Sequence, residues 1–204
     1  MKRTYLDRQL LEIFIAEHLF FSKDYERALV PNLRLGAKSR ALSDLSSALK
    51  FTKRAAICAI ETGDKRMLTA ALKQKGLVLK SMLRSDEAVD AYKESLDIDR
   101  EIGDRGAEAA TLHQIGKVYR DTNRFQEALE YYHESLAIKR EMGNRAAEAA
   151  TLHQIGTVYQ LTNQLEEALE YYNESLKASR EVEEEAAERA ESENGEEVKD
   201  KILS

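Results

Sequence analysis

Cysteine, proline and long apolar runs are scarce in this chain of 204 residues, and each scarcity excludes a class of protein. A single cysteine cannot form an internal disulfide, which fits a reducing compartment. One proline and nine glycines favour helices over a loop-rich β fold. Charged residues such as Asp7, Glu12 and Glu17 interrupt the apolar N-terminal stretch, so it resembles neither a membrane span nor a signal peptide. We expect an amphipathic helix there and a cytoplasmic protein.

The charge of the chain is concentrated at its C-terminal end. The formal net charge is −6, and residues 181–204 hold ten acidic and three basic side chains, a net of −7. The preceding 180 residues are therefore nearly neutral. This balance indicates a globular body with an acidic tail, and it speaks against nucleic acid as a partner.

A period of forty residues runs through the chain. Residues 105–141 and 145–181 share 26 identities in 37 positions, and the nonapeptide EAATLHQIG occurs in both. Residues 65–101 follow the same phase, and 29–62 follow it more weakly. A fixed period of this length is typical of stacked repeats, each of them one supersecondary unit.

Each repeat has the pattern of two helices. Leu112, Ile115, Gly116 and Tyr119 recur at spacings of three and four, as on one face of a helix. Asn123, followed by Gln126, predicts the cap of a second helix, as does Asn163 in the next unit. Glycines in one phase, at 63, 103 and 143, predict the ends of helices. The pattern predicts nine helices, near 5–21, 25–40, 44–61, 66–82, 86–102, 106–121, 125–142, 146–161 and 165–182.

These residues resemble the tetratricopeptide repeat (TPR) pattern. The resemblance rests on Leu112-x2-Ile115-Gly116-x2-Tyr119 followed by Ala128-x3-Tyr132-x2-Ser135. It implies an all-α fold, an α-solenoid of stacked helix pairs, similar to the TPR arrays of STAND-type signalling ATPases and Pins-type scaffolds. The units would be 29–62, 69–102, 109–142 and 149–182 within an array over 1–182, followed by an acidic capping helix or tail over 183–204. Arg140 replaces the proline that usually closes a repeat, so the second helices could run longer.

The two histidines of the repeated nonapeptide, His113 and His153, have three interpretations: catalytic partners, metal ligands or copies of one structural part. Equivalent positions in consecutive units are separated by at least one helix-packing distance, about 8–10 Å. Zinc needs each ligand nitrogen within about 2.1 Å. No nucleophile pattern, metal motif or phosphate-binding loop accompanies them. We therefore expect no enzyme, no metal and no cofactor.

The resemblance also implies which residues face a partner. In a TPR the first helix of each pair lines a concave groove. Carried onto this sequence, the expected partner-binding residues are Lys73, Gln74, Lys80, His113, Gln114, Lys117, Arg120, His153, Gln154 and Gln160. Their lysines and arginine form a basic zone that could hold an acidic peptide.

The function expected from this resemblance is a non-enzymatic scaffold that binds a protein or peptide in its groove. The alternative is a regulatory or sensor segment of a STAND-type ATPase without its nucleotide-binding domain. Two further options stay open: self-association through the terminal helices, and occupation of the groove by the acidic tail.

Overall fold

The computed structural model describes the backbone of residues 2–203 and the side chains of residues 10–187 and 189. This part of the chain contains nine helices and no strand, as the sequence predicts. The helices are α1 (Lys2–Phe21), α2 (Tyr25–Ala41), α3 (Leu45–Thr62), α4 (Lys65–Ser81), α5 (Ser85–Glu101), α6 (Arg105–Asp121), α7 (Phe125–Glu141), α8 (Arg145–Leu161) and α9 (Leu165–Leu203). No helix within these limits is long and apolar enough to cross a bilayer.

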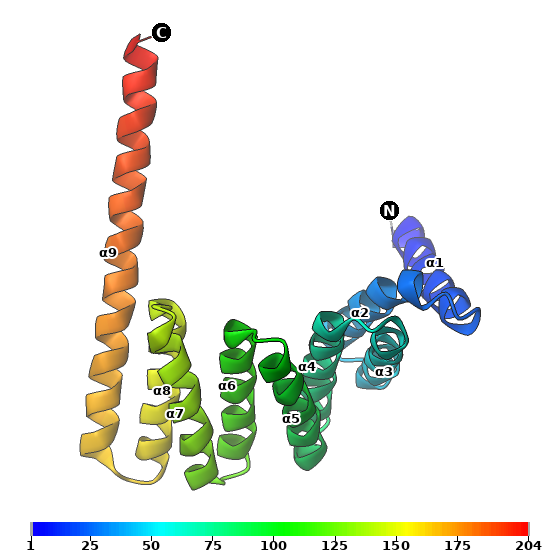
Figure 1. Cartoon of the computed structure of the whole chain (residues 1–204), viewed down its shortest axis with the longest axis horizontal. Helices are drawn as coiled ribbons and strands as arrows, with labels where there is room; N and C mark the ends of the chain where they lie inside the picture. Colours follow the sequence, from blue (N-terminus) through cyan, green and yellow to red (C-terminus); the bar gives the residue numbers. More distant parts are fainter. Residues whose placement is uncertain (1, 204) are drawn as a thin grey trace.

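The helices stack as antiparallel pairs, each packed against the helix before it and the helix after it. From α9 to α4 they stand side by side, and the array turns at α3 and α2 toward the N-terminal helix (Figure 1). The first helices of the pairs, α2, α4, α6 and α8, are called here the A helices, and the second, α3, α5, α7 and α9, the B helices. The A helices α6 and α8 also contact each other directly, as do α2 and α4. Direct contact between successive A helices is the arrangement expected on the inner side of a curved array.

Short turns with a left-handed residue separate the helices. The predicted glycines are confirmed, because Gly63, Gly103 and Gly143 all have φ of +64° to +70°. The prediction that Asn123 caps α7 is wrong. Asn123 has φ +60° and ends the turn after α6, and the residue before α7 is Arg124, whose side chain makes no capping bond. Asn163 has the same conformation, with φ +61°. Asparagine tolerates this region better than most residues, which explains its choice there.

The last helix is longer than predicted. The periodicity places its end near 182, but α9 continues to Leu203 and extends well beyond α8 (Figure 1). In the three preceding units a glycine followed by Asp or Asn ends one helix and caps the next. Glu183 and Glu184 stand at these two positions. Glutamate is a good helix former and a poor left-handed residue, so the chain lacks the local signal to turn.

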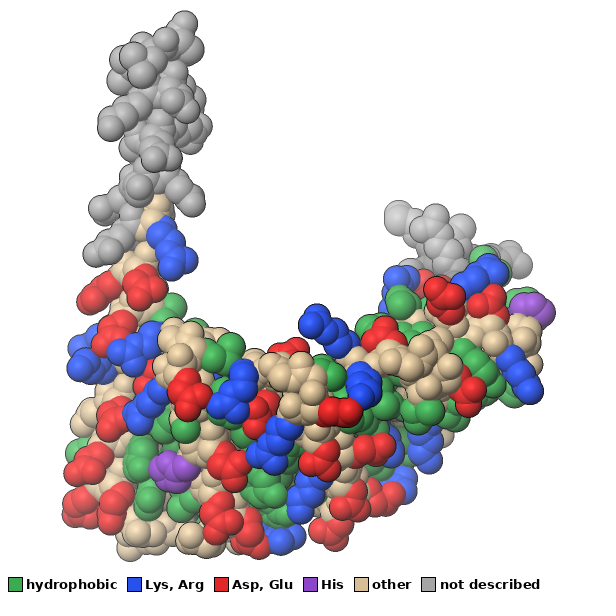
Figure 2. All heavy atoms as spheres, viewed as in Figure 1, with side chains coloured by type: hydrophobic (Ala, Val, Ile, Leu, Met, Phe, Trp, Pro, Cys, Tyr) green, Lys and Arg blue, Asp and Glu red, His purple; other side chains and the backbone are tan. Residues whose placement is uncertain are grey.

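Arginine at the place of the usual proline joins successive units. Arg140 of α7 donates to Glu148 of α8 at 2.9 Å and to Glu174 of α9 at 2.8 Å. One unit earlier Arg100 makes the equivalent bonds to Glu108 and Glu134, at 2.9 and 3.1 Å. Basic and acidic side chains are accordingly interspersed over the face seen in Figure 2. A proline, which has no side-chain donor, could not make this link.

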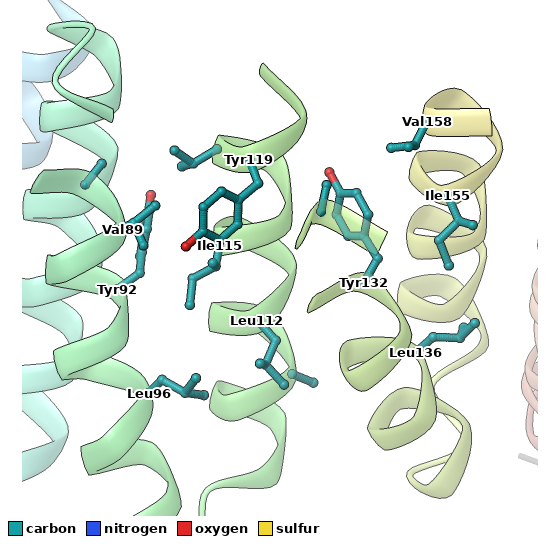
Figure 3. Close-up of a cluster of buried hydrophobic side chains, with 14 of the residues drawn as sticks. Val89, Tyr92, Leu96, Leu112, Ile115, Tyr119, Tyr132, Leu136, Ile155 and Val158 are labelled. Carbon is teal, nitrogen blue, oxygen red and sulfur yellow. The ribbon is translucent and has the colours of Figure 1, made fainter. Parts of the chain in front are cut away.

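The core lies between the two layers of helices. Leu112, Ile115, Tyr132 and Leu136 are at most 3% exposed, and Figure 3 shows Leu96 directed toward α6 and Leu136 toward α8. The glycine in each of the A helices α4, α6 and α8 admits the tyrosine of its partner B helix. A methyl group added at Gly76, Gly116 or Gly156 would lie 2.7–2.9 Å from the ring of Tyr92, Tyr132 or Tyr172. The repeated glycine is therefore a packing requirement.

The B helices α5, α7 and α9 each bond their partner A helix through a buried serine. Ser135 Oγ donates to the carbonyl oxygen of Ala109 at 2.7 Å, and Ser175 Oγ to that of Ala149 at 2.8 Å. Both hydroxyls are buried, so the bond also satisfies groups that water cannot reach. The repeated serine is thus part of the packing. Cys58 is buried in an apolar cluster, and burial raises the pKa of its thiol to about 11, as expected for a cysteine that serves in packing.

Candidate binding surface

The residues expected to bind a partner all lie on three A helices. Lys73, Gln74 and Lys80 are on α4, whereas the middle group is on α6 and the last group on α8. The middle group is His113, Gln114, Lys117 and Arg120, and the last is His153, Gln154 and Gln160. The structure brings some of them together into one cluster and uses others in contacts between units.

A chain of side-chain contacts crosses the ends of α4, α6 and α8. Lys80 Nζ lies 2.7 Å from Asp121 Oδ2, and Arg120 Nη2 lies 2.6 Å from Asp121 Oδ1. Arg120 also donates to Gln154 on α8. Asp121 therefore links two units, and Arg120 links the second of them to a third.

Lys117 gives this group an excess of positive charge. It makes no ion pair or hydrogen bond with any side chain that the structure describes. Burial lowers the pKa of Lys117, and the neighbouring Lys80 and Arg120 lower it further, while Asp121 acts in the opposite direction. Lys80, Lys117 and Arg120 are called here the inner cation cluster. Asp121 pairs with Lys80 and Arg120 but not with Lys117.

The carboxyl of Asp121 remains ionised in this setting. Burial acts to raise its pKa, but the hydrogen bonds from Lys80 and Arg120 outweigh burial and hold the pKa below its usual value. Three cations and one anion leave the cluster with a net charge of about +2 at neutral pH. A surface of this kind favours an anionic group on a partner.

Lys73 has a different environment from the inner cation cluster. Its Nζ lies 2.9 Å from Asp99 Oδ2, and the Asp99 side chain is fully buried. Thr111 of the next unit donates to the same carboxylate at 2.8 Å. Lys73 therefore takes part in a buried contact between α4, α5 and α6.

His113 occupies the equivalent position one unit later, among different partners. Its Nδ1 lies 3.1 Å from Thr151 Oγ1, and its ring packs on Tyr132 with 5.4 Å between the ring centroids. Lys139, at the position of Asp99, donates to the same Thr151 hydroxyl at 2.6 Å. A salt bridge in one interface is thus replaced by neutral hydrogen bonds and a buried lysine in the next.

Burial explains the titration of both residues. It lowers the pKa of His113 to about 3, helped by the charges of Lys139 and of the inner cation cluster, so the imidazole is neutral at physiological pH. Burial alone lowers the pKa of Lys139 to about 8. A neutral δ-tautomer fits the geometry, because the Thr151 hydroxyl donates to the carbonyl oxygen of Ala147 and can accept from both neighbours.

The C-terminal members of the set are more exposed. The ring of His153 lies 5.2 Å from that of Tyr172, and the Tyr172 hydroxyl donates to Gln160 Oε1 at 2.7 Å.

Gln74, on α4, is half-buried, and its Oε1 has no hydrogen-bond partner in the described structure. No group of three metal-ligating side chains occurs among residues 10–187 and 189.

Sequence reasoning missed the contacts between units. It did not pair Lys73 with Asp99, or His113 with Thr151 and Lys139. The signal was present in the period of forty, which aligns Asp99 with Lys139 and Lys73 with His113. An exchange of charge at aligned positions on neighbouring helices suggests contact between them.

Comparison with solved structures shows the same fold in several proteins. BtubC from P. vanneervenii is 19% identical, with a TM-score of 0.72 over 86% of this chain and 74% of that chain. The STAND protein with a tetratricopeptide repeat sensor from Pyrococcus horikoshii is 19% identical, with a TM-score of 0.74 over 90% of this chain and 29% of that chain. A Rap protein complexed with competence and sporulation factor is 15% identical, with a TM-score of 0.70 over 90% of this chain and 54% of that chain. A search of the curated proteins finds no match.

The family model of the tetratricopeptide repeat matches residues 66–141 and, in a second overlapping register, 108–181. The two matches follow the helix pairs from α4 to α9. Because together they span more than half of the sequence, the chain belongs to the tetratricopeptide repeat family.

Proposed function

We propose that the protein is a non-enzymatic scaffold that binds an acidic peptide or partner segment on the surface of its A helices. The inner cation cluster carries this proposal. Lys80 and Arg120 come from two successive units and converge on the carboxylate of Asp121, with the charge of Lys117 beside them. The excess charge has no use in holding the helices together, because no described side chain pairs with Lys117.

The electrostatics favour a carboxylate from a partner. A bound anion would offset the burial and the repulsion that lower the pKa of Lys117. It could also replace Asp121 as the acceptor for Lys80 and Arg120. Partly exposed ion pairs contribute about 0–1 kcal/mol each, so useful affinity needs several of them acting together.

The next unit offers a different chemistry at the equivalent position. Leu161 takes the place of Asp121, and its side chain is 57% exposed. Thr157 and Gln160 take the places of Lys117 and Arg120. A ligand that follows the A helices from α4 to α8 would therefore meet cations first and an apolar side chain afterwards. We expect an acidic residue followed by an apolar one in the bound segment.

The structural neighbours support the choice of an interaction protein. The Rap structure contains a bound factor, and the P. horikoshii protein has its tetratricopeptide repeats as a sensor. This chain is similar to the P. horikoshii protein over 90% of its length, so the second candidate function is a sensor segment of a STAND-type ATPase. Both candidates use the A helices as the recognition surface.

The test uses a random peptide library displayed on phage and selected against the immobilised full chain. We expect acidic residues to be enriched in the selected peptides. Lys117→Glu should reduce the affinity of a selected peptide at least tenfold, because it removes one cation and adds an anion to the cluster.

Lys53→Glu is the matched control, because Lys53 is an exposed lysine on the B helix α3. It makes the same charge change away from the cluster and should leave the affinity within twofold. Selected peptides without acidic enrichment, or equal affinities for Lys117→Glu and the unchanged protein, would refute the proposal.

A further inference from the structure

The outward face of α9 carries an apolar stripe that nothing in the described structure covers. Leu165, Leu169, Leu176 and Arg180, called here the outer stripe, recur at spacings of four and seven along one side of the helix. Leu165, Leu169 and Leu176 are 50–60% exposed. Scattered exposed leucines are ordinary, but an aligned row of them on a terminal helix is a surface suited to packing.

Equivalent residues in the earlier B helices are covered by the next A helix. Leu96 of α5 is 4% exposed and Leu136 of α7 is 3% exposed, whereas Leu176 of α9 is 50% exposed. Figure 3 shows the first two side chains directed at α6 and α8. The outer stripe thus has the composition of a helix-packing face but has no helix packed on it.

The charge at the end of the stripe is also unmatched. Arg100 and Arg140 each donate to a buried glutamate of the following A helix, Glu108 and Glu148, at 2.9 Å. Arg180 is the next member of this series, and it forms no ion pair with a described side chain. It lies with Leu176 at the edge of a surface hollow of about 380 Å³, which is also lined by Asn173, Lys177, Glu181 and Glu184.

We propose that the outer stripe binds an amphipathic helix of a partner protein, with the pattern Glu-x3-Leu-x2-Ile on its buried face. This is the pattern of Glu148, Leu152 and Ile155 in α8, and it recurs in α6. The leucine and isoleucine would cover the exposed leucines, and the glutamate would pair with Arg180. The surface is separate from the inner cation cluster, which lies on the A helices.

Residues 183–204 do not fit this requirement. Glu188 keeps the phase of Glu148, but Ser192 and Gly195 stand where the leucine and isoleucine are needed. The α9 backbone is also helical as far as Leu203, which carries these residues away from the stripe. The tail therefore lacks both the apolar side chains and the turn.

The A helices of a second copy do not fit either. Helices α6 and α8 of that copy carry the pattern, but each already lies between two neighbouring helices. The A helices nearer the N-terminus have Ala28 and Leu68 at the glutamate position, so neither could pair with Arg180. A helix from another protein is the occupant that satisfies both the apolar and the charged part of the stripe.

The probe is a fluorescently labelled synthetic peptide with the sequence of residues 144–162 of this chain, added to the full-length protein. We expect saturable binding by fluorescence anisotropy, weakened by the cost of ordering an isolated helix. Leu176→Asp should reduce the affinity at least tenfold, and Arg180→Glu about fivefold. A peptide with Glu148→Lys should bind poorly to the unchanged protein and regain affinity for the Arg180→Glu variant.

Two control variants separate this surface from others. Leu83→Asp changes a leucine that is 89% exposed in the turn before α5, and it should have no effect. Lys117→Glu should also have none, so the result is independent of the proposed function. Three results would each overturn the proposal. The peptide does not bind, the Leu176→Asp and Arg180→Glu variants bind it as tightly as the unchanged protein does, or the unchanged protein forms a dimer that Leu176→Asp abolishes.

Discussion

Gly116 of α6 lies so close to Tyr132 of α7 that a methyl group at Gly116 would be 2.7 Å from the ring atom Cδ1. The tyrosine is fully buried and has little room to move. We expect Gly116→Ala to lower the free energy of unfolding by about 1–3 kcal/mol, because overpacking outweighs the gain in helix propensity. Urea denaturation followed by circular dichroism measures this difference.

Gly106 provides the control in the same helix. A methyl group there would lie no closer than 3.5 Å to Met142, and the equivalent residue of the next unit is Ala146. Gly106→Ala should therefore stabilise the protein by about 0.5–1 kcal/mol. Equal effects of the two substitutions would contradict the close packing of Gly116 against Tyr132.

Lys139 should destabilise the protein at neutral pH. Its pKa falls from about 10.4 in the unfolded chain to about 8 in the folded protein. The unfolded chain then binds more protons between these values, so stability rises with pH from about 8 to 10. Below pH 8 the full cost is present, on the order of 3 kcal/mol. Lys139→Met should raise the unfolding free energy at pH 7 and remove this rise, as measured by denaturation at several pH values.

The preceding interface supplies a design for the same site. There Lys73, Asp99 and Thr111 form a salt bridge with a hydrogen-bonded hydroxyl. The double substitution His113→Lys with Lys139→Asp should recreate it beside Thr151. We expect the double variant to be more stable than Lys139→Asp alone by about 1–3 kcal/mol. Additive effects would show that the two positions do not interact.

Acid should lower the stability of the folded protein through His113. The folded protein keeps the imidazole neutral down to about pH 3, while the unfolded chain binds a proton near pH 6.5. Stability therefore falls as pH decreases below about 6.5. His113→Gln should flatten this part of the stability profile relative to the unchanged protein. NMR titration of the imidazole provides the direct measurement.

The fold could be predicted from the sequence because its signal is repeated. The forty-residue period, the leucine and tyrosine stripes and the glycines at 63, 103 and 143 all report local packing or backbone conformation, and the structure confirms them. The side-chain partners could not be predicted in the same way. Lys73 and Lys117 have the same residue type on equivalent helices. Lys73 is paired with the buried Asp99, whereas Lys117 has no paired carboxylate among the side chains that the structure describes. That difference depends on a B helix 26 residues away.

Tyr132 and Tyr172 should respond differently to loss of the hydroxyl group. The Tyr132 hydroxyl is buried and has no hydrogen-bond partner in the described structure. The Tyr172 hydroxyl donates to Gln160 at 2.7 Å. Tyr132→Phe should therefore be neutral or stabilising, since the unpaired group is removed. Tyr172→Phe should cost about 0.5–1.5 kcal/mol in the same denaturation experiment. The reverse order would show that the Tyr132 hydroxyl has a partner.

Glu148 should matter more than Glu174, although both accept from Arg140. The Glu148 side chain is 4% exposed and the Glu174 side chain is 55% exposed. Glu148→Gln should lower the unfolding free energy by about 1–3 kcal/mol, because a buried charged acceptor is lost. Glu174→Gln should change it by less than about 0.5 kcal/mol, as for other surface ion pairs. Thermal denaturation of the two variants tests this ranking.

The loss of stability at low pH depends in part on the carboxylate of Glu148. Burial acts to raise the pKa of Glu148, but the hydrogen bonds from Arg140 and Arg145 outweigh it and hold the pKa below its usual value. Its contribution is complete above about pH 4.3 and is lost as pH falls through the lower folded value. Glu148→Gln should therefore remove part of the loss of stability below pH 4.3. If Glu148→Gln leaves the loss of stability at low pH unchanged, that loss arises from other carboxyl groups.

Glu183 and Glu184 should control the length of α9. Their equivalents Gly143 and Asn144 end α7 and cap α8, with φ +64° at the glycine and an Asn144 hydrogen bond of 3.0 Å to the Ala147 amide. Replacing both, Glu183→Gly with Glu184→Asn, should interrupt the helix at this point. Amide hydrogen exchange should then become at least tenfold faster around residues 181–187, with no change in α8. Glu183→Ala with Glu184→Ala should leave the exchange slow, because alanine favours the helix. Equal exchange in both double variants would show that residues other than 183 and 184 set the length of α9.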